Sequence, residues 1–308
     1  MRALIIGTGS IGQRHMRNLR SVDPAIEFTL LRRNAEPLAL WPDATVEVDL
    51  AAALRLTPDL AVLATPSALH FDVLQSLIAH RIPAYVEKPI VTTADQVAVI
   101  REALAQNPGV AHIAGFNLRL LPSLEDARQA VSRGDLGQIV RASFSAGQWL
   151  PDWRKGQDHR QGYSARSSEG GGVLFDLSHE FDAARFLLGD MELLYAATAR
   201  VDALEIDSEA VAVATARSTS GALVSINLDY VTRHPVRRYE LVGTQATLTW
   251  DLPAKSLVSS SSTGSASLSE DPSDFDVAMT YQTAMQAFLA GVRTGDAGDL
   301  QDLEDGLR

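Results

Sequence analysis

The stretch Leu4-Ile5-Ile6-Gly7-Thr8-Gly9-Ser10-Ile11-Gly12 decides the fold class of this chain. An apolar run typical of a buried strand leads into three glycines spaced GxGxxG, and apolar residues then recur at helical spacing. Gly7 permits a tight turn, Gly9 lets a ligand approach the backbone, and Gly12 allows close helix–strand packing. The N–H groups of Ser10, Ile11 and Gly12 face the phosphates of a dinucleotide in such a turn. A glycine turn without a ligand is the alternative, and the strand-to-helix context favours the dinucleotide.

Strands and helices alternate from this turn to about residue 118. We expect strands at residues 3–6, 26–31, 60–64, 83–86 and 111–115, with a helix after each of the first four. Strands separated by helices of this length form a parallel sheet through right-handed crossovers. The sequence therefore predicts a doubly wound parallel (Rossmann) domain of the α/β class over residues 1–118.

After Arg119 the pattern changes to short runs of alternating apolar and polar residues. We expect a helix at 123–132, strands at 139–146, 193–201, 210–218, 222–230, 238–242 and 246–250, and a final helix at 281–292. The serine-rich residues 259–267 have no periodicity and are expected to form a solvated loop or hairpin tip. This pattern predicts a second, α+β domain over residues 119–308 with a mostly antiparallel open sheet.

Size and composition limit the classes of function. A chain of 308 residues exceeds the size of most single cores, which favours two domains. The net charge of −11 argues against nucleic acid or an anionic membrane as a general partner. No apolar run approaches the roughly 18 residues of a membrane span, and we find no signal peptide. We therefore expect a soluble, cytoplasmic protein.

Metal chemistry is not expected. The chain has no cysteine, which excludes disulfides, thiol catalysis and thiolate metal sites. The histidines at 15, 112, 159 and 234 share no metal-ligand spacing. We therefore predict no metal.

Two arginines follow the second predicted strand. In such domains an acidic residue about 20 residues after the glycines binds the ribose 2′-hydroxyl of NAD. This chain has no acid there and carries Arg32 and Arg33, which could hold a 2′-phosphate by charge-assisted hydrogen bonds. The alternative is that both are solvated loop arginines. The pattern favours NADP(H) over NAD(H).

The tripeptide Glu87-Lys88-Pro89 closes the apolar run at residues 82–86. It falls at the carboxyl edge of the predicted parallel sheet, where ligands bind in such folds. Pro89 favours an extended backbone at Lys88, which would aim the ammonium inward. By position alone, a surface lysine and a functional one are equally good interpretations.

These motifs together resemble the Gfo/Idh/MocA oxidoreductase family, which includes glucose–fructose oxidoreductase and inositol dehydrogenase. The matches run in the family's order over essentially the whole chain. They are the N-terminal glycines, Ala64-Thr65-Pro66 with His70, Glu87-Lys88-Pro89, Gly115-Phe116-Asn117-Leu118-Arg119, and Gly170-Gly171-Gly172 leading to Asp176-Leu177-Ser178-His179. Each alone is unspecific, but the ordered set is highly specific.

The resemblance implies roles for several residues. Lys88 matches the active-site lysine beside the nicotinamide, and Asp176 and His179 match the helix that supplies the proton-transferring group. Positions along the cofactor cleft are matched by Thr65, Pro66, His70 and Glu87. The resemblance also implies a homodimer or homotetramer, because the open sheet face of the second domain commonly pairs with another subunit.

One departure from the family concerns Asp176 and His179. Many members separate these residues by four positions, whereas here the separation is three and Glu180 takes the fourth place. Alignment on His179 and Asp182 keeps the histidine in register, so His179 is the leading base and Asp176 the less certain residue. If residues 176–188 form one helix, Asp176 and His179 lie about 60° apart, away from its apolar stripe. The alternative is a structural histidine at a loop-to-helix corner.

An aromatic and basic segment precedes the Gly170–Gly172 turn. Trp153, Arg154, Arg160 and Tyr163 suit a pyranose ring that bears an anionic group, since tryptophan can stack and arginine can bind in bidentate fashion. We also expect Arg119 to contact the substrate. The alternatives are a surface loop held by its own tryptophans and a contact between subunits.

The combined hypothesis is an NAD(P)-dependent oxidoreductase acting on a secondary alcohol or ketone of a sugar, polyol or sugar derivative. His179 exchanges the hydroxyl proton and Lys88 stabilises charge on the same oxygen. Two alternatives stay open: a cofactor-binding regulatory protein without turnover, and a redox-assisted glycosidase of the same superfamily.

Overall fold

The structure, a computed structural model, describes the whole chain except residues 155, 296–297 and 299. It contains two compact units. The first comprises Met1–Asn117 with Ala278–Arg308, and the second comprises Leu118–Val277. In the described part of the chain, no helix is both long enough and apolar enough to cross a membrane.

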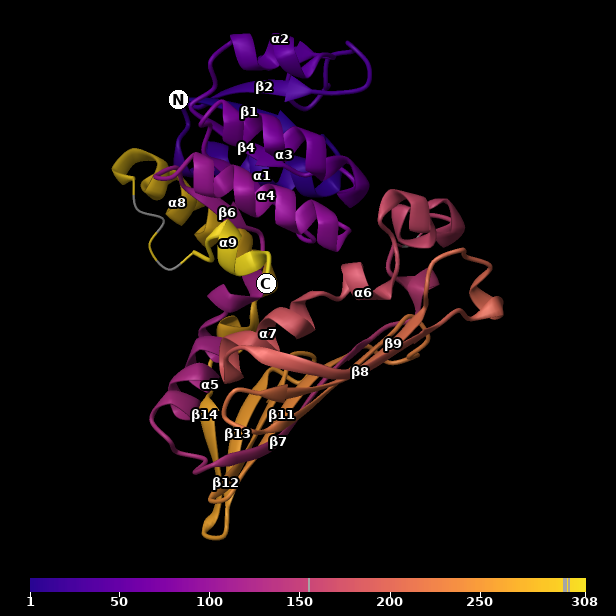
Figure 1. Cartoon of the computed structure of the whole chain (residues 1–308), viewed down its shortest axis with the longest axis vertical. Coiled ribbons are helices and arrows are strands. Elements are labelled where there is room, and N and C mark those ends of the chain that lie inside the picture. Colours follow the sequence, from indigo (N-terminus) through magenta and orange to yellow (C-terminus); the bar gives the residue numbers. More distant parts are fainter. Residues whose placement is uncertain (155, 296–297, 299) are drawn as a thin grey trace. The chain divides into compact units, whose positions relative to one another are not determined.

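The first unit is built on a six-stranded parallel sheet with the strand order β3-β2-β1-β4-β5-β6 (Figure 1). The strands are β1 Arg2–Ile6, β2 Glu27–Leu31, β3 Thr45–Glu47, β4 Leu60–Leu63, β5 Ala84–Val86 and β6 His112–Ala114. The helices between them are α1 Ser10–Val22, α2 Leu50–Arg55, α3 His70–Ala79 and α4 Ala94–Gln106. This is the order of the Rossmann fold, and it confirms the predicted parallel α/β sheet. Because all strands run the same way, their carboxyl ends share one edge.

The end of the chain returns to the first unit, which differs from the expected second domain of residues 119–308. The returning helices are α8 Val277–Thr294 and α9 Leu303–Gly306. Leu303 and Leu307 belong to the same buried apolar cluster as Val86. The Phe288 ring lies 5.9 Å from that of Tyr85. An amphipathic pattern predicts a helix but does not say which core the helix covers, so the sequence placed this segment in the wrong unit.

The second unit is built on an eight-stranded sheet with the order β14-β13-β12-β11-β7-β10-β9-β8. Its strands are β7 Ile139–Gly147, β8 Met191–Ala199, β9 Val211–Ser218, β10 Leu223–Asp229, β11 Val236–Gly243, β12 Ala246–Asp251, β13 Ser256–Ser261 and β14 Gly264–Ser269. Neighbouring strands are antiparallel except β7 and β10, which are parallel. The mostly antiparallel second sheet is therefore confirmed.

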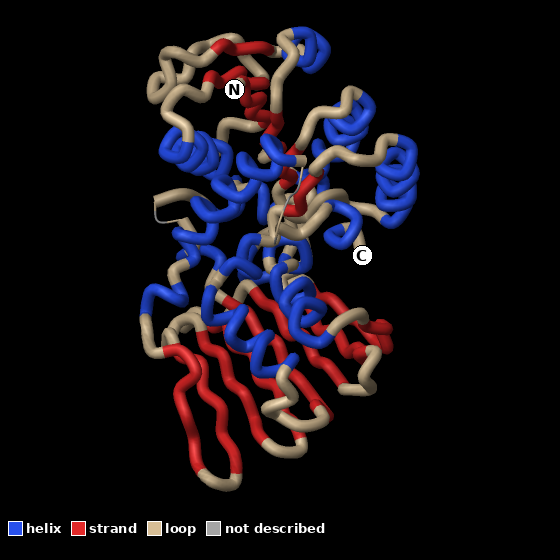
Figure 2. Tube along the Cα trace, turned by 90° about the vertical axis from the view of Figure 1, so that its left-hand side faces the viewer, coloured by secondary structure: helices blue, strands red, loops and turns tan. Residues whose placement is uncertain are grey.

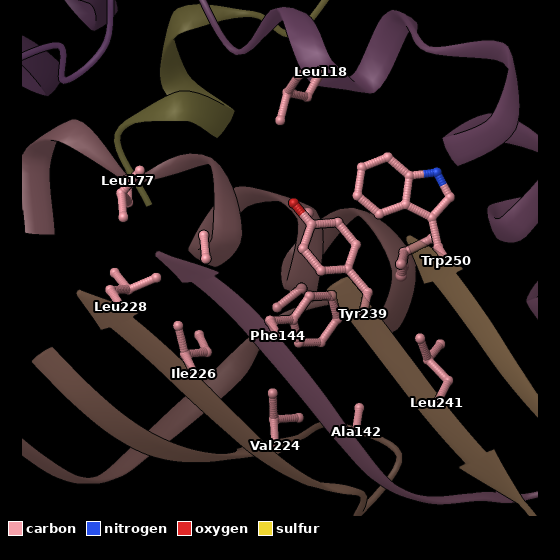
Figure 3. Packing of buried hydrophobic residues seen from close by; sticks show 14 of the residues in the cluster. Leu118, Ala142, Phe144, Leu177, Val224, Ile226, Leu228, Tyr239, Leu241 and Trp250 are labelled. Carbon is pink, nitrogen blue, oxygen red and sulfur yellow. The ribbon is translucent and has the colours of Figure 1, made fainter. Parts of the chain in front are cut away.

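Helices cover one face of this second sheet. They are α5 Pro122–Ser132, α6 Val173–Asp176 and α7 His179–Leu188. Figure 1 labels α5 and α7 beside the sheet, and Figure 2 shows helices in blue over one face of its red strands. Side chains of β9 alternate between buried and exposed, as expected for a sheet covered on one side. The buried side chains form one core, in which the rings of Tyr239 and Trp250 stack 4.5 Å apart beside Phe144 (Figure 3).

Two features of the sheets were not predicted. The short edge strand β3 carries no apolar run, so its sequence gives little strand signal. The serine-rich segment, expected as a solvated loop or hairpin tip, forms the paired strands of the hairpin β13–β14, in which backbone pairing rather than side-chain burial defines the strands. Period-2 patterns reveal strands with one buried face, and these exposed serines have none.

A buried histidine on β6 makes the stability of the first unit dependent on pH. The side chain of His112 is 4 % exposed, and neither ring nitrogen has a hydrogen-bond partner among the described residues. Burial, with a smaller contribution from Arg81, lowers the pKa of His112 to about 4. Below the usual histidine pKa of about 6.5, the unfolded chain therefore takes up a proton that the folded chain refuses.

We expect the free energy of unfolding to fall by about 2–3 kcal/mol between neutral pH and about pH 4.5 because of this one side chain. His112→Leu should remove that part of the pH dependence, measured by urea denaturation at several pH values. His80→Leu, a change to an exposed histidine, is the matched control. Equal pH slopes for His112→Leu and the wild type would contradict the assignment.

Candidate functional site

The glycine turn forms a bare helix N-terminus at the carboxyl end of β1. Gly7 has φ +94°, and a Cβ there would lie 2.6 Å from the Ala64 carbonyl oxygen. A Cβ at Gly9 would meet no atom within 4 Å, so the backbone is open to a ligand at this point. No side chain caps α1, and no acidic residue lies in its first turn. The N–H groups and the positive end of the helix dipole are therefore suited to a phosphate.

The two arginines after β2 differ in their surroundings. Arg32 is half-buried, and its Nη1 donates a hydrogen bond to the backbone carbonyl of Glu36. Arg33 is exposed and has no hydrogen-bond or ion-pair partner among the described residues. Arg33 is thus the better placed of the two to meet an added anion.

Thr65 and Pro66 follow β4, the strand beside β1 in the sheet. The Thr65 hydroxyl is buried and has no hydrogen-bond partner among the residues described. Buried hydroxyl groups are normally satisfied, so this group has spare capacity for a ligand or water. Pro66 directly precedes the short helical turn Ser67–Leu69.

Lys88 lies two residues beyond the end of β5 and is half-buried. The Glu87 backbone N–H donates to the Leu63 carbonyl at 2.9 Å, which continues the pairing of β4 with β5. The Lys88–Pro89 peptide bond is cis. Because β5 is parallel to β1 and separated from it only by β4, Lys88 shares the sheet edge of the glycine turn.

His70 and Glu87, matched to the cofactor cleft in the family, are both buried and occupied within the protein. The His70 Nδ1 lies 3.0 Å from the Pro89 carbonyl oxygen, and its Nε2 lies 3.0 Å from the Thr65 carbonyl oxygen. The Glu87 Oε1 lies 2.6 Å from Nε2 of His15, a residue that was given no role from the sequence. Both ring nitrogens of His70 thus face the backbone, which supports an internal role for this residue.

The helix that was expected to carry both Asp176 and His179 is broken between them. Helix α6 ends at Asp176 and α7 begins at His179, so the prediction of one continuous helix is wrong. Asp176 accepts hydrogen bonds from the hydroxyls of Tyr163 and, at 2.6 Å, Tyr230. Burial and the Asp176 carboxylate raise the pKa of Tyr230, so its hydroxyl stays protonated and can donate.

His179 is the first residue of α7 and is 7 % exposed. Two carboxylates follow it in the first turn, where negative charge is favourable. Glu180 is fully buried and pairs with Arg237 at 2.7 Å. Asp182 binds Arg119, whose Nη2 lies 2.6 Å from Oδ1 in a mostly buried ion pair. An arginine therefore holds each of these two carboxylates.

The predicted substrate residues fall into two groups. Arg119 is held by Asp182, and Arg160 binds both Asp158 and Glu205 at 2.9 and 2.7 Å. Trp153 and Arg154 line a small hollow in the second unit. The Trp153 ring meets the Tyr230 ring edge-on at 5.2 Å, which places Trp153 beside the tyrosines that bind Asp176.

Sequence reasoning missed two residues of this region, Tyr230 and Arg233. Tyr230 ends the predicted strand at 222–230, and its hydroxyl reaches Asp176. The Arg233 guanidinium lies 3.6 Å from the centre of the Trp149 ring. A tyrosine at a strand end is a weak sequence signal for a functional residue. Tyr230 comes to lie beside the 149–153 segment because β10 pairs in parallel with β7, and this pairing is not visible in the sequence. In the described residues no group of three or more His, Asp or Glu side chains could hold a metal ion.

Two family models match the chain. An oxidoreductase family with an NAD-binding Rossmann fold matches residues 1–114, and the GFO/IDH/MocA C-terminal domain matches residues 124–249. The chain belongs to the Gfo/Idh/MocA oxidoreductase family. The first match confirms an NAD-binding Rossmann domain and leaves the choice between NAD and NADP open.

Two curated relatives of this Gfo/Idh/MocA protein are named as inositol dehydrogenases. Inositol 2-dehydrogenase of Rhizobium meliloti is 28 % identical over 235 residues, covering 72 % of this chain and 67 % of the relative. The NAD(+)-dependent scyllo-inositol 2-dehydrogenase of Bacillus subtilis is 25 % identical over 202 residues, covering 61 % and 54 %. The alignments thus span between about half and two thirds of these relatives. Levoglucosan dehydrogenase, solved with NADH and levoglucosan, has the same fold, with a TM-score of 0.86 at 16 % identity over 100 % of this chain and 93 % of that one.

Proposed function

We propose that this protein is an NAD(P)-dependent oxidoreductase that interconverts a secondary alcohol and a ketone on a sugar, polyol or sugar derivative. The observation that carries the proposal is the shared sheet edge of the first unit. The uncapped N-terminus of α1 follows β1, and Lys88 follows β5, two strands away in the same parallel sheet. In such sheets the ligand lies along the carboxyl ends of the strands. The polyol dehydrogenases among the relatives support the substrate class.

The residues of the first unit fit the cofactor. Gly7, Gly9, Ser10, Ile11 and Gly12 would hold its pyrophosphate, since Gly9 leaves the backbone open and the first turn of α1 has no cap. Thr65 offers a hydroxyl without a partner among the described residues, with Pro66 beside it. When bound, the nicotinamide accepts or returns a hydride at its C4. His70 and Glu87 contribute by supporting the backbone around Lys88 rather than by touching the cofactor.

Lys88 is proposed to hydrogen-bond the oxygen of the reacting carbon. An ammonium group stabilises the negative charge that builds on this oxygen as the base removes the hydroxyl proton. In the reverse direction the same group polarises the ketone. A half-buried lysine at a sheet edge is more effective in this role than a fully solvated one, because charge interactions strengthen where water is excluded.

His179 is proposed as the base that takes the hydroxyl proton, and as the acid that returns it during reduction. Histidine is the side chain that most often transfers protons in enzymes, which suits this role. Asp176 is proposed as a positioning residue, because its carboxylate is held by the hydroxyls of Tyr163 and Tyr230. These two hydrogen bonds hold the last residue of α6 in place. The short turn after it leads to His179, the first residue of α7.

Substrate contacts are proposed for Trp153 and Arg154, whereas Tyr163 is assigned to holding Asp176, to which its hydroxyl already donates. Trp153 and Arg154 line the hollow in the second unit, and a tryptophan face stacks well on a sugar ring. Arg119 and Arg160 are assigned a structural role instead, because carboxylates already bind their guanidinium groups.

The preference for NADP(H) is proposed to come mainly from Arg33, which is exposed and has no partner among the described residues. Arg33→Ala should raise the Kd for NADP about 10- to 100-fold, the effect of losing charge-assisted hydrogen bonds, and should leave the Kd for NAD unchanged. Arg32→Ala is the matched control and should have a smaller effect, since Glu36 already binds that guanidinium. Titration calorimetry with both cofactors measures this. Unchanged NADP affinity in both variants would remove the proposal.

A homo-oligomer is proposed from the exposed apolar side chains of β8. Leu193 and Tyr195 are each 62 % exposed on this edge strand. Exposed apolar groups of this size often mark an interface. Analytical ultracentrifugation of the wild type and of Leu193→Glu with Tyr195→Glu tests this proposal, with dissociation of the oligomer as the expected result.

The activity itself is tested with a panel of cyclic polyols and sugars. The purified protein is incubated with NAD or NADP and each compound, and the absorbance of the reduced nicotinamide is followed. At least one compound should reduce the cofactor. Release of an aglycone without net reduction would identify the glycosidase alternative instead.

A further inference from the structure

A buried histidine of α1 contacts the residue that precedes Lys88. His15 is 0 % exposed, and its Nε2 lies 2.6 Å from Oε1 of Glu87. An ionised carboxylate can only accept a hydrogen bond, so Nε2 carries the hydrogen. The rings of Tyr85 and Tyr281 lie 5.2 and 5.9 Å from the imidazole and enclose it. The imidazole is therefore closed to bulk water, while the Glu87 side chain is 11 % exposed.

The contact fixes the direction of the strand end. Tyr85 and Glu87 are two residues apart and both meet His15, as expected for side chains on one side of an extended chain. Val86 points to the other side and packs in the apolar cluster with Leu74 and Ile100 of α3 and α4. The chain bends at Lys88, directly after Glu87, so the fixed Glu87 side chain marks the point at which the lysine leaves the strand direction.

The backbone on the far side of Lys88 is fixed independently. The His70 Nδ1 lies 3.0 Å from the carbonyl oxygen of Pro89 and 3.2 Å from that of Ile90. The Glu87 N–H is bonded to Leu63. The backbone is thus held on both sides of Lys88, and His15 holds the Glu87 side chain between these two points.

We propose that His15 is a positioning residue for Lys88 and acts through the Glu87 carboxylate. His15 lies on α1, one helical turn after the glycine turn. Its contact with Glu87 therefore joins the helix that is proposed to bind the cofactor to the end of β5 that carries Lys88. Loss of this contact leaves the phosphate-binding turn intact but leaves the mostly buried Glu87 carboxylate without its partner, so Glu87 must turn toward water and shift the backbone next to Lys88. The expected change in kcat rests on the proposed function, whereas the expected change in the position of Lys88 does not.

Two variants separate positioning from folding. His15→Leu removes the hydrogen bond, and His15→Gln keeps a donor near the position of Nε2. His112→Leu is the matched control, because His112 is equally buried in the same unit but has no hydrogen-bond partner among the described residues. Glu87→Gln should act in the same direction as His15→Leu, and it serves as the test if His15→Leu does not fold.

The first readout needs no activity. The chain contains only three lysines, Lys88, Lys155 and Lys255, so a protein labelled with ¹³C at lysine Cε gives three signals, and Lys88→Met assigns one of them. In His15→Leu the Lys88 signal should shift or broaden while the other two stay in place. His15→Gln should restore it, and His112→Leu should leave all three unchanged.

The second readout is kinetic. His15→Leu should lower kcat by about 10- to 100-fold, the effect of a small misplacement of a reacting group, and change the cofactor Kd by less than about threefold. His15→Gln should recover most of kcat. An unmoved Lys88 signal in His15→Leu overturns the inference whether or not turnover is found. Absence of turnover in the wild type, with a shifted Lys88 signal, contradicts only the proposed function.

Discussion

Lys88→Met is expected to lower kcat for the proposed polyol oxidation by about 10²- to 10³-fold, the usual loss when one preorganised stabiliser of a developing oxyanion is removed. Methionine preserves most of the length and apolar stem of lysine but has no charge, so the substitution tests the ammonium group itself. The cofactor Kd should change little, because the phosphate-binding turn lies on α1. Steady-state kinetics with the best substrate of the panel and a separate cofactor titration provide the two numbers.

Lys255→Met is the matched control for this experiment. Lys255 is exposed in the turn between β12 and β13, and its replacement should leave kcat unchanged. A kcat for Lys88→Met within about threefold of the wild type would remove Lys88 from the mechanism. A parallel loss of cofactor binding would instead make it a cofactor ligand.

His179→Asn is expected to lower kcat by about 10²- to 10⁴-fold, the range for loss of a general base. Asparagine can still form hydrogen bonds but cannot carry the proton. The wild type should lose kcat/KM on the acid side, where the base is protonated, and the variant should lack that limb. The pH profile therefore distinguishes a base from a residue that only shapes the site.

His80→Asn controls for the chemical change, since His80 is exposed, caps the end of α3 and, among the residues that the structure describes, bonds only the backbone of that helix. If His179→Asn keeps the acid limb of the wild type, another group is the base. Asp176→Asn then becomes the informative comparison, because it weakens the two tyrosine hydrogen bonds without removing the imidazole.

Much of the fold could be predicted because its signals are local. The apolar strands of the first sheet are buried on both sides, and the glycine turn needs residues without a Cβ at Gly7 and Gly12. In the second sheet, strands such as β9 carry one buried face and therefore a period of two. These features depend on neighbours in the sequence, so the sequence alone reveals them.

The missing parts depend on contacts between distant residues. The break between Asp176 and His179 is invisible in a helical apolar pattern that runs through both, whereas Tyr230 binds Asp176 from 54 positions away. His15 lies on the buried face of α1, where a polar side chain is a weak signal, and its partner Glu87 is 72 positions distant. Within the candidate site, Lys88 and His179 were identified through the family resemblance. The sequence did not reveal the supporting residues His15 and Tyr230.

The most direct test of the central claim is the transfer of hydride from a substrate carbon to nicotinamide. A cyclic polyol deuterated at the reacting carbon is incubated with the protein and NAD or NADP, and the reduced cofactor is analysed by mass spectrometry and NMR. The account predicts deuterium at nicotinamide C4 with the wild type and almost none with Lys88→Met. Tight cofactor binding without any deuterium transfer across the panel would contradict it and would favour a cofactor-binding protein without turnover.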